Sequence, residues 1–289
     1  MKAIVWFGGG AYIGLHVGYA QGALKNVNED ANYGVSAGSL MSVLRSTKTQ
    51  AEILTIIGTI KQTSDVFCGK NVFDDVGNAV GRRWDSIPFM GMKYDPLRAI
   101  LHAQIKGAFL KPTTIGRVNL DTGDLQHVTA LSDGTFKTDD DSLGAVANLP
   151  DFLDAVLCSC LIYPLVDAFL DKNNHGWIDG GFREGGPVTK AILDGATELW
   201  LCLTGPFSQD CGFTGNGNDP LSGITRLLEL MANQNVVNQV NIALRSGLPV
   251  HILDAVPVGA STNFNQKDLQ QNILIGQSYA ARDGVAPIT

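Results

Sequence analysis

The chain has 289 residues, of which 45% are hydrophobic and 17% are charged. This composition is typical of a globular enzyme rather than a disordered chain, and the length allows one large core or two modest ones. The net charge of −7 and a pI near 5.1 argue against broad nucleic-acid binding, which needs a basic face.

The cysteines and the N-terminal residues narrow the class of protein further. Five cysteines have neither a disulfide-scaffold spacing nor a zinc-site spacing, so reduced thiols are expected. The apolar run in MKAIVWFGGG is too short for a signal-peptide core, and no stretch of about 18 apolar residues predicts a membrane span. We expect a cytoplasmic protein without a metal or cofactor, and any contact with lipid would be a transient visit to a membrane surface.

Strand-like and helix-like segments alternate from the first residues onward. Lys2–Phe7 is predicted to be a strand, Tyr12–Val27 a helix, Tyr33–Val35 a second strand and Ala37–Arg45 a second helix. A capping box, Thr49-x-x-Glu52, then predicts the start of a third helix.

The alternation continues to the end of the chain. Asp95-Pro96 and Asp219-Pro220 each place an N-cap residue before a proline that suits the first helical position, and Thr114–Leu131 resembles a hairpin that turns at Asp121-Thr122-Gly123. Further strands are predicted at Trp177–Ile178, Glu198–Thr204 and Pro249–Val258, and further helices at Pro187–Asp194, Leu221–Arg245 and Gln266–Arg282. Such alternation predicts a mostly parallel sheet with helices on both faces, in one α/β domain over residues 1–289.

Two stretches depart from the α/β pattern. Phe67–Lys93 mixes aromatic and methionine side chains with arginines and has no clean period. It suits a lid that touches a membrane, and it suits ordinary packing or a dimer contact equally well. Thr204–Asp219 is rich in Gly, Asn and Asp, which predicts a long loop.

Ser36 lies in Gly34-Val35-Ser36-Ala37-Gly38, between the second predicted strand and the helix after it. A G-x-S-x-G sequence in this context is typical of a nucleophile elbow, in which a sharp turn exposes the serine hydroxyl. Acyl transfer also requires backbone N–H groups near the developing oxyanion, and Gly8-Gly9-Gly10 at the end of the first strand could supply them. Asp179 ends a later predicted strand before Gly180 and Gly181, where its carboxylate could accept the serine proton.

These three motifs, in this order, resemble those of the patatin-like phospholipase family. The apolar, small-residue segment Asp154–Phe169 before the Asp motif adds to the resemblance, which covers roughly Lys2–Thr204. The resemblance implies a three-layer α/β/α fold and a Ser-Asp dyad that cleaves acyl esters of phospholipids or lysophospholipids. It assigns Ser36 as nucleophile and Asp179 as base. It assigns the oxyanion hole to Gly8, Gly9, Gly10 and Ala11, and the elbow and Asp motif to Gly34, Gly38, Gly180 and Gly181.

One position departs from the family pattern. The usual Gly-Gly-Gly-x-Arg/Lys-Gly reads GGGAYI here, so Tyr12 replaces the basic residue and Ile13 replaces the glycine. This change leaves no basic side chain at that position to contact a substrate phosphate, and it does not remove the backbone donors.

Other interpretations use the same residues. Gly8–Gly14 also fits a dinucleotide-binding turn, although the second strand then ends in Ser36 instead of an acidic residue. The fold could serve as a catalytically silent binding module, and a Ser-Asp-His triad would need His251, for which mid-strand burial in a core is expected instead. Asp139-Asp140-Asp141 lacks the alternate ligand spacing of an EF-hand calcium loop and suits a solvated loop.

Overall fold

A computed structural model describes residues 1–67, 93–161, 168–171, 173–206, 220–259 and 264–283. The predicted excursion at residues 67–93 and the predicted loop at residues 204–219 therefore lie almost entirely outside the described residues. Asp219, the predicted N-cap, is outside them as well.

The centre of the fold is a mixed sheet with the strand order β10-β9-β8-β1-β2-β3-β4-β5. Strands β9, β8, β1, β2 and β3 run parallel, and β10, β4, β5, β7 and β6 pair antiparallel with their neighbours. The strands are β1 (Lys2–Trp6), β2 (Ala31–Val35), β3 (Thr113–Asn119), β4 (Leu125–Ala130), β5 (Phe136–Thr138), β6 (Phe169–Leu170), β7 (Gly176–Asp179), β8 (Glu198–Cys202), β9 (Val250–Leu253) and β10 (Arg282–Asp283).

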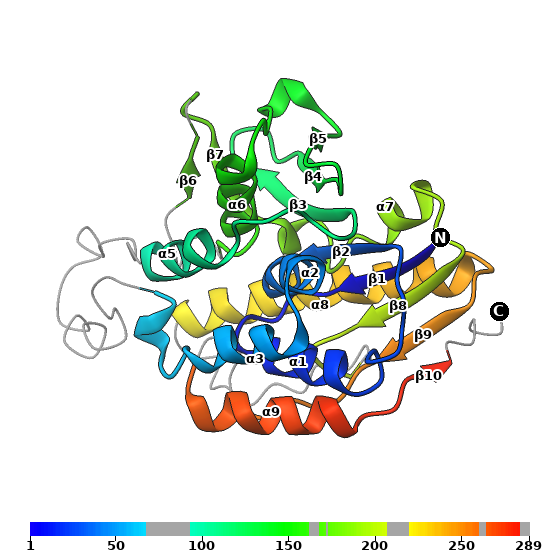
Figure 1. Cartoon of the computed structure of the whole chain (residues 1–289). Helices are drawn as coiled ribbons and strands as arrows, with labels where there is room; N and C mark the ends of the chain where they lie inside the picture. Colours follow the sequence, from blue (N-terminus) through cyan, green and yellow to red (C-terminus); the bar gives the residue numbers. More distant parts are fainter. Residues whose placement is uncertain (68–92, 162–167, 172, 207–219, 260–263, 284–289) are drawn as a thin grey trace.

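Helices cover both faces of this sheet (Figure 1), so the α/β/α architecture with a mostly parallel central sheet is confirmed. The helices are α1 (Ile13–Gln21), α2 (Ala37–Thr47), α3 (Gln50–Gly58), α5 (Asp95–Gln104), α6 (Leu149–Cys158), α7 (Val188–Leu193), α8 (Pro220–Arg245) and α9 (Gln266–Ser278). Short 3-10 turns η1 (Gly10–Tyr12), η2 (Thr63–Asp65), η4 (Asp141–Leu143) and η5 (Gly180–Phe182) join them.

Strand β1 shows how the two layers are built. Because successive side chains of a strand point to opposite faces, Ile4 and Trp6 enter the core beneath α1, α2, α3 and α9, whereas Val5 and Phe7 enter the core beneath α7 and α8. All four side chains are fully buried. This double burial explains why the strand reads as a continuous apolar run.

Most of the local signals are confirmed, and two helices, α1 and α9, end several residues earlier than predicted. The capping box of Thr49 and Glu52 is present at the start of α3. Helix α1 ends at Gln21 instead of Val27, and Gly22 follows it as the C-cap residue. Helix α9 ends at Ser278, and Arg282–Asp283 form β10 instead of a last helical turn.

Helix α5 begins at Asp95, the residue that was predicted to be its N-cap. Tyr94 is the N-cap, so Asp95 occupies the first helical turn, with Pro96 beside it. A carboxylate there still favours the helix, since the first turn carries the positive end of the helix dipole.

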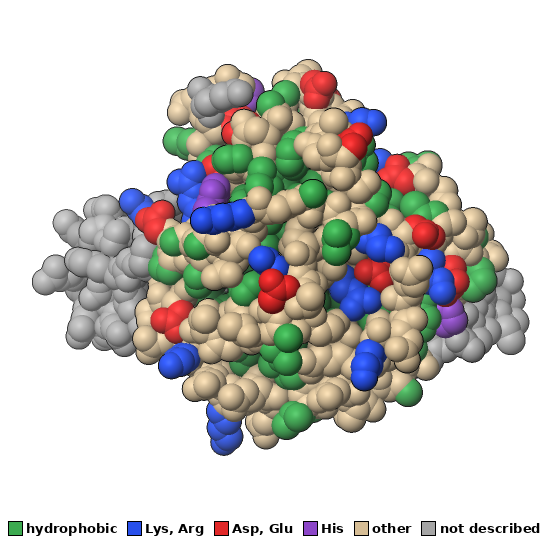
Figure 2. Space-filling view, viewed as in Figure 1, with side chains coloured by type: hydrophobic (Ala, Val, Ile, Leu, Met, Phe, Trp, Pro, Cys, Tyr) green, Lys and Arg blue, Asp and Glu red, His purple; other side chains and the backbone are tan. Residues whose placement is uncertain are grey.

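Basic and acidic side chains are interspersed on the face shown in Figure 2, among hydrophobic and neutral ones. Among the described residues, no helix is both long enough and apolar enough to cross a bilayer.

Candidate active site

Ser36 lies at the end of β2, in the turn that begins α2. Its φ of 55° is the left-handed conformation that non-glycine residues seldom adopt. A side chain at Gly34 would collide with the carbonyl oxygen of Gly38, and one at Gly38 with that of Trp6. The two glycines therefore allow strand, turn and helix to approach closely enough to form the elbow.

Asp179 reaches the same place from the opposite direction. The first part of β3 pairs with β2, and this pairing ends where Gly116 of β3 lies opposite Val35 of β2. From Arg117 onward, the same edge of β3 pairs antiparallel with β7, and Arg117 lies opposite Asp179. Since β4 occupies the other edge of β3, β7 must continue the line of β2 and meet it end to end. Asp179 ends a strand, as predicted, but this strand runs antiparallel to β3 and is not one of the parallel strands of the sheet.

The two side chains meet in the gap between β2 and β7. The Ser36 side chain lies close enough to the Asp179 carboxyl group to lower its pKa, and the residues are 7% and 4% exposed. The Gly181 N–H donates a hydrogen bond to Asp179 Oδ1 at 2.7 Å. Burial raises the pKa of Asp179 to about 7, against the opposing effects of Ser36 and the Gly181 N–H, so the carboxyl group can gain or lose a proton near neutral pH.

The glycine segment after β1 lies beside this pair. A side chain at Gly8 would come within 3.1 Å of Ser36 Cβ. The Gly8 N–H already donates to the Gly185 carbonyl at 3.2 Å, so it is not available to a substrate. Gly9 caps η1, and the first N–H groups of such a turn lack partners within it. The predicted oxyanion donors are thus reduced to the N–H groups of Gly9, Gly10 and Ala11.

The segment after α6 supports both turns, and sequence reasoning missed its role. Ser159 Oγ accepts the Ser36 N–H at 3.0 Å and donates to the Gly116 carbonyl at 2.5 Å. The Leu161 carbonyl accepts the Asp179 N–H at 3.0 Å. The small-residue sequence CSCL before the Asp motif was the available signal. Small side chains in this segment let its backbone and the Ser159 hydroxyl approach the turns of Ser36 and Asp179.

An apolar cavity opens onto Ser36. Its volume is about 780 Å³, including the part open to solvent, and it lies between α2, α3, α5 and the segment around Phe264. Its lining comprises Gly10, Ile13, Ser36, Ala37, Leu40, Leu44, Ile56, Ile57, Ile60, Val66, Phe67, Tyr94, Leu97, Ile100, Leu101, Gln104, Cys160 and Phe264. No charged side chain is among these described residues.

The histidines lie elsewhere. His251 is not the core residue that we expected: its side chain is 25% exposed, stacks on Trp200 with ring centroids 4.3 Å apart, and lies 3.5 Å from Glu198. His16 is fully buried and bonds the Cys202 carbonyl, and burial lowers its pKa to about 3. In the part of the chain that the structure describes, no group of three or more His, Cys, Asp or Glu side chains is arranged to hold a metal ion.

Tyr12, which stands where the family carries a basic residue, donates a hydrogen bond from its hydroxyl to the Gly259 carbonyl at 3.1 Å. The two nearby cations of the Asp motif are engaged elsewhere. Arg183 donates to the Gly123 carbonyl at 2.6 Å, and Lys190 pairs with Asp194 at 2.5 Å. Neither side chain is directed to Ser36 by these contacts.

Two comparisons with known proteins bear on the family of this chain. A search of curated proteins found no match. The family model described as patatin-like phospholipase matches residues 5–192, a span that contains the glycine segment, the elbow of Ser36 and the turn of Asp179. Because this span is well over half of the chain, the protein belongs to the patatin-like phospholipase family, a family of lipid acyl hydrolases.

Proposed function

We propose that this protein is a serine acyl hydrolase that cleaves fatty-acyl esters of phospholipids or lysophospholipids through an acyl-enzyme. The observation that carries the proposal is the closeness of the Ser36 side chain to the buried Asp179 carboxyl group, with Ser36 lining an apolar cavity. The acyl chain would occupy the cavity, where each buried methylene contributes about 0.8 kcal/mol. The ester carbonyl would then lie next to Ser36 Oγ.

Proton transfer follows from the contact between the two side chains. As Ser36 Oγ forms a bond to the acyl carbon, its proton passes to the Asp179 carboxylate. The carbonyl oxygen gains negative charge, which the N–H groups at Gly9, Gly10 and Ala11 would stabilise together with the positive end of α2. When the C–O bond breaks, Asp179 returns the proton to the leaving alcohol.

Deacylation repeats these steps with water. Asp179 accepts a proton from the water as its oxygen attacks the acyl carbon, and the proton then returns to Ser36 Oγ as the fatty acid leaves. A carboxyl group whose pKa is about 7 suits both halves of the cycle, because it accepts and releases a proton with little free-energy cost near neutral pH.

The test combines active-site labelling with product analysis. A fluorophosphonate probe should label the wild-type protein at Ser36 and should not label Ser36→Ala, which should fold normally and lose ester hydrolysis. Ser42→Ala is a matched control, since the Ser42 hydroxyl only donates to the Ser39 carbonyl within α2. Mass spectrometry of the products from a panel of lipid classes would identify the acyl position and the headgroup. Undiminished turnover in Ser36→Ala would contradict the assignment of Ser36 as nucleophile. A wild-type protein that neither labels nor turns over any ester would contradict the proposal and favour a binding module.

A further inference from the structure

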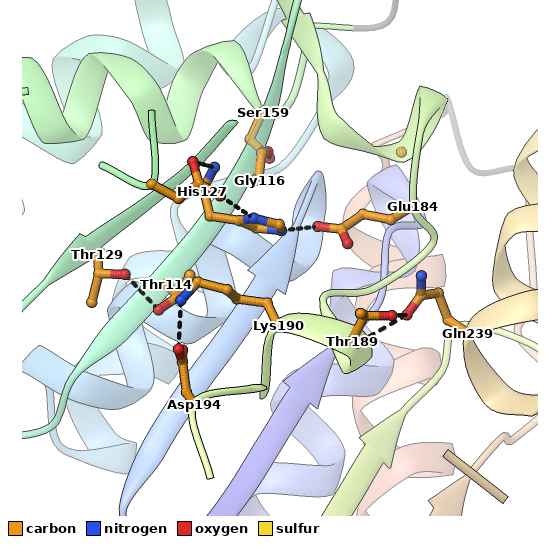
Figure 3. Close-up of polar contacts among 12 residues, drawn as sticks. Thr114, Gly116, His127, Thr129, Ser159, Glu184, Thr189, Lys190, Asp194 and Gln239 are labelled. Carbon is orange, nitrogen blue, oxygen red and sulfur yellow. Dashed lines mark hydrogen bonds and ion pairs between the residues drawn. The ribbon is translucent and has the colours of Figure 1, made fainter. Parts of the chain in front are cut away.

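An imidazole lies between two carboxylates, close to Gly116 in β3 (Figure 3). His127, in β4, places Nδ1 2.7 Å from Asp139 Oδ2 and Nε2 2.8 Å from Glu184 Oε1. The His127 side chain is 12% exposed and that of Glu184 is 4% exposed. Both ring nitrogens can donate a hydrogen bond only in the protonated ring, so this geometry is that of an ion cluster, buried at Glu184 and open to solvent at Asp139, whose side chain is 36% exposed.

The fold makes room for the Glu184 carboxylate at a single position of the sheet. Gly116 is opposite His127 in the pairing of β3 and β4, and a side chain there would come within 2.7 Å of Glu184 Oε1. The Gly116 carbonyl also accepts the hydroxyl of Ser159, which in turn binds the Ser36 N–H. The carboxylate therefore lies directly against the strand that supports the elbow.

Glu184 also lies within the segment that joins the other two parts of the site. Its N–H donates to the Gly180 carbonyl at 3.0 Å, in the turn that begins at Asp179. The carbonyl of the next residue, Gly185, accepts the Gly8 N–H at 3.2 Å. Anchoring the Glu184 side chain thus restrains both the Asp179 turn and the glycine segment.

We propose that His127 and Glu184 form a positioning pair that holds residues 180–185 so that the Asp179 turn and the glycine segment keep their places beside Ser36. Asp139 holds the His127 ring from its other side, through the contact with Nδ1. The catalytic part of this inference rests on the proposed function, and the structural part does not.

The pair should respond to alkaline pH. Two charged groups act on the ring, Asp139 from the segment after β5 and Glu184 from the segment after η5. The residue opposite His127 in β3 is Gly116, which carries no charge. Burial lowers the pKa of His127, but the hydrogen bonds and charges of the two carboxylates raise it to about 9 overall. Above this pH the ring loses a proton, and one carboxylate then faces a nitrogen lone pair.

Two variants and one control separate positioning from general destabilisation. Glu184→Gln and His127→Gln each remove a charge of the pair. Glu29→Gln removes a charge of a comparably buried pair, Arg45–Glu29, at the far end of α2 from Ser36. We expect Glu184→Gln to lower kcat at least tenfold, with KM within about twofold, whereas Glu29→Gln changes neither. The alkaline fall of kcat should move to lower pH in Glu184→Gln and disappear in His127→Gln.

Hydrogen exchange tests the positioning itself without relying on turnover. Amide exchange in peptides covering Gly8 and residues 180–185 should become at least tenfold faster in Glu184→Gln and remain unchanged in Glu29→Gln. If His127→Gln does not fold, Glu184→Gln and the wild-type protein at pH 10 provide the same comparison after correction for intrinsic exchange rates. Unchanged exchange in these peptides would overturn the proposal, whatever the activity. A wild-type protein without turnover or Ser36 labelling would instead overturn the proposed function, and exchange would still decide whether the pair positions the segment.

Discussion

Replacing Asp179 with Asn is expected to reduce turnover and increase stability together. The carboxylate that would accept the Ser36 proton is also costly to bury, and burial raises its pKa from 3.8 to about 7. Between these two pH values the folded protein binds the proton more tightly than the unfolded chain does. The free energy of unfolding therefore falls as the pH rises through this interval, and the loss is complete above pH 7.

The size of this cost follows from the same interval. At about 1.4 kcal/mol per pH unit, the rise from 3.8 to about 7 corresponds to about 4 kcal/mol as an upper limit. Asparagine keeps the shape of the side chain and can still accept the Gly181 N–H, and it carries no charge. We expect Asp179→Asn to be more stable than wild type by about 1–4 kcal/mol at pH 8 and nearly equal to it at pH 4.

The assay is urea unfolding at both pH values, with kcat/KM measured on a soluble ester at pH 8. Turnover should fall by about two to four orders of magnitude, the usual size of general-base catalysis. Asp154→Asn is the control, because this carboxylate binds Arg98 through two hydrogen bonds of 2.8 and 2.7 Å, and its loss should cost stability instead of adding it. An Asp179→Asn protein that is less stable at pH 8 and keeps its turnover would refute both the buried charge and the catalytic role.

Four further predictions concern the base, the acyl-chain cavity, the role of histidine and the headgroup preference. The kcat/KM of the wild-type enzyme should rise with pH up to about 7, close to tenfold per unit at the acidic end, and a flat profile from pH 5 to 8 would exclude Asp179 as the base. Ile100→Trp, at the cavity wall on α5, should reduce kcat/KM for decanoyl esters more than for butyryl esters, whereas equal losses would place the acyl chain elsewhere. His251→Ala should hydrolyse esters within about twofold of wild type, and an inactive but folded variant would favour a triad hydrolase. Because Tyr12 replaces a basic residue, monoacylglycerols should be hydrolysed at rates comparable to phospholipids, and a strict need for a phosphodiester would point to another cation near Ser36.

Much of the fold follows from local signals that need no tertiary context. The apolar run of β1, the capping box at Thr49 and the hairpin turn at Gly123 all appear as predicted, because burial on both faces, capping and a positive φ each require particular residue types over a few positions. The same holds for the elbow of Ser36, where the two glycines satisfy a steric requirement within five residues.

Contacts between distant segments were decided only by the tertiary structure. Sequence cannot show that β7 would run antiparallel and meet β2 end to end, since strand direction depends on which edge of β3 is free. The close packing of α1 on α9, about 250 residues away, depends on glycines such as Gly22, where a side chain would collide with Gln277. The contacts of Ser159 with the elbow and of His127 with Glu184 also join residues far apart in the chain. The sequence thus determined which groups could do the chemistry, and long-range packing determined which of them meet and with what pKa, because burial and neighbouring charges exist only in the folded chain.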